Sequence, residues 1–89
     1  MNETEIAERA EALPERFADR LPEPNVDGLR DMAEGGEWGE LVSELVAGLV
    51  KRQPAVTVAE RDELAALLDA MGEPTDGLDT LNVTDQEAS

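Results

Sequence analysis

Six acidic residues recur at short intervals in the middle of the chain, and Arg30 is the one base among them. They are Asp27, Asp31, Glu34, Glu37, Glu40 and Glu44. Carboxylates can act as general acids and bases, ligate hard metal ions, or pair with basic side chains of another molecule. These three uses frame the functional hypotheses for this set, which we call the acidic surface.

The residue types elsewhere in the chain argue against catalysis. The sequence contains no His, Cys or Tyr and a single lysine, Lys51, so the usual bases and nucleophiles are scarce. The glycine-rich run at residues 35–39 lacks the spacing and the lysine of a phosphate-binding loop. No calcium loop with its fixed Asp and Asn spacing is present either. We therefore predict no enzyme, no catalytic residue, no cofactor and no metal site, although the many carboxylates leave an acid pair or a hard-metal site open as a third hypothesis.

The charge of the chain limits the class of partner. Twenty-two acids against seven bases give a net charge of −15, which would be repelled by nucleic acid and by anionic membranes. A basic protein is the partner that this charge favours. The alternative is that the acidity confers solubility or adapts the protein to high salt. The absence of cysteine, of a basic apolar leader and of a membrane-spanning segment predicts a cytoplasmic protein.

The acidic surface needs helices to position it, and the composition favours them. Leu, Ala and Glu are abundant, while the chain has two aromatics and one Ile, so we expect an all-α bundle of about four helices without a substantial sheet. Apolar residues at helical spacing over residues 38–50 predict a central helix. Its small residues, Gly39, Ser43 and Ala47, form a strip suited to close helix approach. We predict a core that includes Trp38, Leu41, Leu45, Leu49, Phe17 and Leu68.

The remaining helices flank this central one. The first begins at about Asn2 or Thr4 and is kinked or restarted at Pro14; the second follows Asn25 as its cap and ends at Gly35 and Gly36. A capping box from Thr57 to Glu60 opens a further helix that closes at residues 72–74, and residues 76–81 are expected to add a short helical turn. We predict one domain over residues 1–81 and a flexible acidic tail over residues 82–89.

Several of these segments, in this order, resemble the MafI-type immunity proteins of bacterial polymorphic toxin systems. The resemblance covers roughly residues 17–81 and is carried by Leu-Pro before a short helix and by four further runs. These runs are Leu29-Arg30-Asp31-Met32, Gly36-Glu37-Trp38-Gly39, Thr57-Val58-Ala59-Glu60 and Ala70-Met71-Gly72. The resemblance implies a small helical protein that binds a cognate toxin domain, often a nuclease, and blocks it in the producing cell or its kin.

Two main hypotheses follow. The first is an immunity protein that binds a basic toxin domain through the acidic surface and is a monomer or weak homodimer when free. The second is a regulatory or scaffold module that dimerises through the strip of Gly39, Ser43 and Ala47, with the charge serving solubility.

Overall fold

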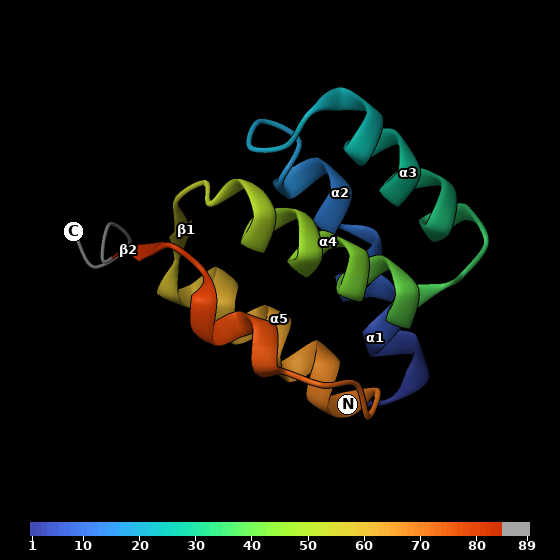
Figure 1. Ribbon diagram of the computed structural model, residues 1–89. Coiled ribbons are helices and arrows are strands. Elements are labelled where there is room, and N and C mark those ends of the chain that lie inside the picture. Colours follow the sequence, from blue (N-terminus) through green and yellow to red (C-terminus); the bar gives the residue numbers. More distant parts are fainter. Residues whose placement is uncertain (85–89) are drawn as a thin grey trace.

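The computed structural model describes residues 1–84 and shows the predicted all-α bundle (Figure 1). Within these residues the elements are α1 (Glu3–Glu11), α2 (Leu13–Arg16), α3 (Glu23–Glu34), α4 (Trp38–Arg52), β1 (Val56–Thr57), α5 (Val58–Ala70), the 3-10 helix η1 (Asp76–Thr80) and β2 (Val83–Thr84). If α1 and the single turn α2 are counted as one interrupted segment, the bundle has four helices, as expected.

Helix α4 is the centre of the bundle. It packs against α1, α3, α5 and η1, and Figure 1 shows it between α3 on one side and α5 with η1 on the other. Leu41, Leu45 and Leu49 on α4 are fully buried. Burying one leucine side chain contributes about 1.5–3 kcal/mol, so this single face of α4 supplies much of the hydrophobic stabilisation. The predicted central role of this helix is confirmed.

The N-terminal helical segment is interrupted where the sequence predicted. Asn2 caps α1 by accepting a hydrogen bond from the Glu5 amide at 2.8 Å. The helix ends at Glu11, and a new turn, α2, begins at Leu13 with Pro14 in its first turn, where the missing N–H removes no helical bond. The segment therefore restarts at Pro14, which was one of the two outcomes expected.

Helix α3 begins earlier than predicted, so the assignment of Asn25 as its cap is wrong. The cap residue is Pro22, whose extended backbone leads into a first turn that contains Pro24. A proline is tolerated there because the first amides of a helix have no intrahelical acceptor. At the other end Gly36 adopts φ +70°, and the Glu37 amide donates to the Met32 carbonyl at 2.9 Å. This closure turns the chain back into α4.

The C-terminal half follows the prediction except at the start of the tail. Thr57 and Glu60 form the capping box of α5, and Leu78 and Leu81 dock against the core. The tail was expected to fray from Asn82, but Val83 pairs with Val56 in a short parallel ladder, and this part of the prediction is wrong. The ladder is stabilised because the Asn82 carbonyl accepts from the Val56 amide at 3.0 Å. The rest of the predicted tail, residues 85–89, lies outside the described residues.

The predicted core is confirmed, with one difference in degree. Leu41, Leu45, Leu49, Phe17 and Leu68 are buried, whereas Trp38 is half-buried and packs at the edge of the core. None of the helices in residues 1–84 combines the length and apolarity that a membrane span requires.

The strip of small residues does not serve helix packing within the chain, so that prediction is wrong. Ser43 and Ala47 are exposed because they lie outside the arc of α4 that faces the core. The tightest glycine contact with α4 occurs instead at Gly77 in η1, where an added Cβ would meet the Val46 Cγ1 at 3.3 Å. The strip remains an uncovered surface on α4.

Candidate functional site

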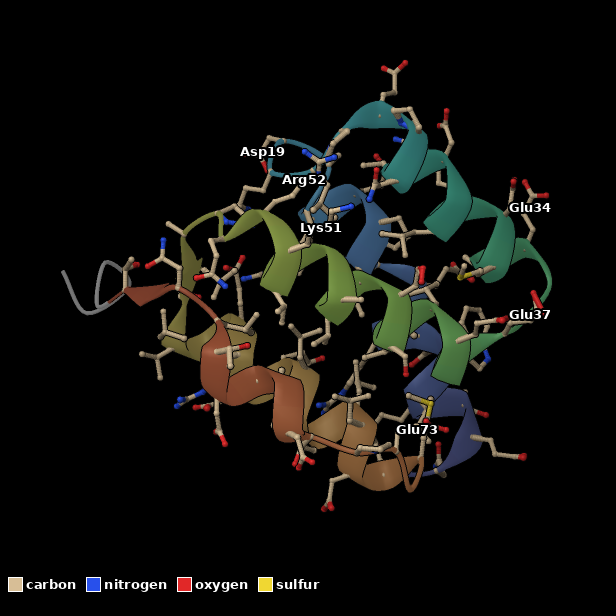
Figure 2. All side chains as sticks on the ribbon, viewed as in Figure 1. Asp19, Glu34, Glu37, Lys51, Arg52 and Glu73 are labelled. Carbon is tan, nitrogen blue, oxygen red and sulfur yellow. The ribbon has the colours of Figure 1, made fainter. Side chains whose placement is uncertain are left out.

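The structure exposes all six residues of the acidic surface on the outer sides of two packed helices. Asp27, Asp31 and Glu34 belong to α3; Glu37 caps α4, and Glu40 and Glu44 follow in it. Glu44 shares a surface pocket with Gly28 and Met32 of α3, so it lies at the junction of these two helices. Figure 2 shows Glu34 at the end of α3 and Glu37 at the start of α4, at the same edge of the molecule in this view.

Most bases of the chain are engaged outside the acidic surface, and Arg30 is engaged within it. Among residues 1–84, ion pairs involve five of the seven bases, namely Arg9, Arg16, Arg20, Arg30 and Arg61. The two bases without an ion pair in this range, Lys51 and Arg52, lie at the opposite end of α4 from Glu37 (Figure 2). The acidic surface thus keeps most of its charge, and these two bases lie at the far end of α4 from it.

Arg30 is the single base within the acidic surface, and it pairs with two carboxylates at once. Its Nη1 donates to Asp27 Oδ1 at 3.0 Å, while its Nε donates to Glu15 Oε2 at 2.7 Å. Hydrogen bonding to Glu15 raises the pKa of Arg30, and the same bond lowers the pKa of Glu15. Arg30 is thus a local salt-bridge partner of Glu15 and Asp27. The other five acids have no ion pair within the described part of the chain.

A groove lies beside the start of α4 and was not foreseen from the sequence. It has a volume of about 550 Å³, and Ile6 from α1, Trp38 from α4 and Met71 after α5 provide its apolar surface. Glu3, Glu37 and Glu40 also line it. We call it the Trp38 groove.

Glu73 is a further acid beside this groove. A Cβ added at Gly39 would meet the Glu73 Oε2 at 3.5 Å, and Figure 2 shows Glu73 next to the first turn of α4. Neither Glu3 nor Glu73 could be joined to the acidic surface by sequence spacing, because each comes from a distant segment. For Glu73, the one local signal in the sequence was Gly72 directly before it, which marks a turn at the end of α5.

The most strongly perturbed carboxyl belongs to Glu60 and has a structural role. Its carboxylate is 5% exposed and accepts from the Arg20 Nη2 at 2.7 Å, the Arg16 Nε at 3.1 Å and the Thr57 amide at 2.9 Å. These bonds, that of Arg20 above all, lower the pKa of Glu60 to about 2. Glu60 lies in the first turn of α5, whereas the end of α5 reaches the Trp38 groove, so the two sites are at opposite ends of that helix.

The carboxylates do not gather into a metal site in the part of the chain described. No group of three acidic side chains able to hold a metal ion occurs in residues 1–84. What the structure brings together is an acidic surface over α3 and α4 and an apolar groove with acidic walls at its end.

Comparison of the chain with protein-family models, with curated proteins and with solved structures returned no match. The resemblance to MafI-type immunity proteins stays a prediction made from the sequence.

Proposed function

We propose that this chain is a cytoplasmic immunity protein that binds a basic toxin domain, such as a nuclease, through the acidic surface and so neutralises it. The observation that carries the proposal is the uneven use of charge. Five acids of this surface have no ion pair in residues 1–84, and Arg30, the one base among them, is already engaged by Asp27 and Glu15. The carboxylates of this surface can therefore form ion pairs with a basic partner.

The energetics support a binding surface more than a stabilising one. Asp27 with Asp31, and Glu40 with Glu44, are like-charge pairs at i,i+4 on their helices, and each pair costs about 0.2–0.5 kcal/mol. The position of Glu40 in the first turn of α4 offsets part of this cost through the helix dipole. The set therefore gives the isolated protein little stability, whereas a basic partner would relieve the repulsion.

The mode of action would be electrostatic capture followed by coverage of the toxin's own substrate groove. A nuclease presents basic side chains to its phosphate substrate, and an acidic helical surface offers them carboxylates instead. Complementary charge can raise association rates to about 10⁸–10⁹ M⁻¹s⁻¹ at low salt. Speed of this kind suits an inhibitor that must act before the toxin meets its substrate.

Co-expression with the C-terminal domain of a toxin encoded next to this chain tests the proposal. We expect rescue of growth and co-purification of the two proteins. Replacing Glu37, Glu40 and Glu44 with Lys should slow association and remove its salt dependence while the helical circular dichroism signal persists. A control with the same charge change replaces Glu8, Glu11 and Asp69, which are exposed outside the acidic surface.

The result that overturns the proposal is failure of both rescue and co-purification. Equal association rates for the two triple variants would instead show that total charge, and not this surface, governs binding.

The scaffold alternative is supported by the exposure of Ser43 and Ala47 on α4. A symmetric dimer through this strip would place Glu40 and Glu44 near their copies, which opposes association at low salt. Light scattering of the free chain separates the two functions, because the scaffold hypothesis requires a dimer mass without any partner.

A further inference from the structure

We infer that the Trp38 groove is a docking site for a partner segment in which one or two apolar side chains are flanked by Lys or Arg. The segment would insert its apolar side chains between Ile6, Trp38 and Met71 and place its basic groups against Glu3, Glu37, Glu40 and Glu73. As a feature of the toxin interface, this inference rests on the proposed function; as a binding property of the chain, it can be tested without a toxin.

The first support is the incomplete burial of Trp38. A tryptophan is a strong contributor to binding when a partner covers it, because its large ring buries much area at a small cost in conformational entropy. Trp38 packs against the core and still lines the groove with Met71, whose flexible thioether adapts to different shapes. The groove therefore offers an apolar contact surface that the chain itself leaves half-covered.

The second support is the absence of side chains at two lining positions. Gly36 and Gly39 flank Glu37 and Trp38, and both glycines line the groove. Gly36 needs its glycine for backbone reasons, since its φ is +70°. Gly39 is different, because it lies in α4 and a Cβ there would make only an ordinary contact with Glu73 at 3.5 Å. Its lack of a side chain keeps the groove open beside Trp38.

The third support is charge, which selects the occupant. Every charged residue that lines the groove is an acid, and Glu73 adds another. A segment with basic groups beside its apolar side chains would satisfy both kinds of surface. A second copy of this chain, with its net charge of −15, and an anionic membrane would both be repelled.

The position of the groove connects it to the acidic surface. Glu37 and Glu40 belong to both, so a partner lying along α3 and α4 would reach the groove at the start of α4. The acidic surface would then steer the partner, while the groove would hold it, since apolar anchors govern dissociation more than surface charges do.

The intrinsic fluorescence of Trp38 reports directly on the groove, because the chain has one tryptophan. The probe is the tryptophan-free peptide RRLLRR, titrated into the full chain, with RRSSRR and EELLEE as controls. We expect a saturable blue shift of the emission with RRLLRR, at least about tenfold weaker binding for RRSSRR because the apolar anchor is absent, and no binding of EELLEE.

Two matched variants locate the site. Gly39→Leu fills the groove and should weaken RRLLRR binding by about tenfold or more, as loss of an anchor site does. Ser43→Leu adds a leucine side chain one turn along α4 at an exposed position outside the groove, and binding should be unchanged. Circular dichroism checks that both variants fold. If Gly39→Leu fails to fold, Glu73→Lys tests the same side of the groove from another segment. It replaces an acid with a base, so RRLLRR binding should weaken by about threefold to tenfold.

The outcomes separate this inference from the proposed function. Equal binding of RRLLRR and RRSSRR, or equal losses in Gly39→Leu and Ser43→Leu, would overturn the groove as an anchor site. If toxin rescue occurs and Gly39→Leu retains it, the immunity function stands and the groove has no part in it. If RRLLRR binds as expected but no toxin is neutralised, the groove stands and the proposed function fails.

Discussion

Replacing Glu60 with Gln tests whether one ionised carboxylate joins the N-terminal segment to α5. Glutamine has nearly the same shape and can keep the capping interaction with the Thr57 amide. It loses the charge that faces Arg20 and Arg16, which come from the segment following α1. The substitution therefore isolates the contribution of charge in a side chain that is 5% exposed.

The size of the effect follows from the pKa of Glu60. Its value of about 2 in the folded chain lies below the ordinary 4.5, so the ionised form stabilises the fold at neutral pH. Each unit of pKa difference corresponds to about 1.36 kcal/mol, so the lowering of the Glu60 pKa corresponds to about 3 kcal/mol of stabilisation. Because the Arg20 side chain is 22% exposed, water screens part of the interaction, and we expect a loss of about 2–3 kcal/mol in Glu60→Gln at neutral pH.

The sign of the pH dependence is fixed by the direction of that shift. A lowered pKa in the folded state means that the stabilisation is complete above about pH 4.5 and disappears as the pH falls toward about 2. The difference between parent and Glu60→Gln in the free energy of unfolding should therefore shrink over this interval. Taking the difference removes the contribution of the other carboxylates, which titrate in both proteins.

Urea unfolding followed by circular dichroism at several pH values measures this difference. Glu63→Gln is the matched control, since Glu63 pairs with Arg9 at 3.1 Å and both side chains are more than a third exposed. Surface pairs of this kind contribute at most about 1 kcal/mol. A loss in Glu60→Gln no greater than in the control, or a loss that stays constant down to about pH 2, would refute the reasoning.

Three further predictions concern the stability of the fold. Gly28→Ala should stabilise α3 by about 0.5–1 kcal/mol, because nothing lies within 4 Å of the added methyl. Gly36→Ala should lower the free energy of unfolding by about 1–2 kcal/mol, because an alanine is strained at the φ of +70° found there. Thermal unfolding of the two variants checks both signs. Leu45→Ala, at a fully buried position of α4, should lower the free energy of unfolding in urea by about 2–5 kcal/mol. Raising NaCl from about 0.02 M to about 0.5 M should increase the melting temperature, because the acids repel one another and salt screens that repulsion; an unchanged or lower value would contradict it.

The sequence predicted best where short-range patterns decide the structure. The apolar spacing of α4, the Thr57–Glu60 capping box and the interruption at Pro14 are local signals, and the structure confirms all three. Pairing of Val56 with Val83 has no such signal, since it joins segments far apart in the chain. The orientation of Ser43 and Ala47 was misjudged because the width of the core-facing arc depends on the neighbouring helices.

The candidate site shows the same difference between local patterns and contacts that join distant segments. The acidic surface could be found from spacing, because its members follow one another along two consecutive helices. The Trp38 groove could not, since Ile6, Trp38 and Met71 meet only after α1, α4 and α5 pack together. Packing also showed that Arg9, Arg16, Arg20 and Arg61 are engaged outside the acidic surface, which the count of acids and bases alone could not reveal.

The buried ion pairs of this chain lie away from the Trp38 groove. Arg16 and Arg20 are engaged with Glu60 at the end of α5 that lies away from the groove, where burial makes the pairing strong. Two acids that have no ion pair in residues 1–84, Glu37 and Glu40, border the helix start where Trp38 is half-buried. A basic partner with an apolar anchor, as proposed above, would satisfy both features at once.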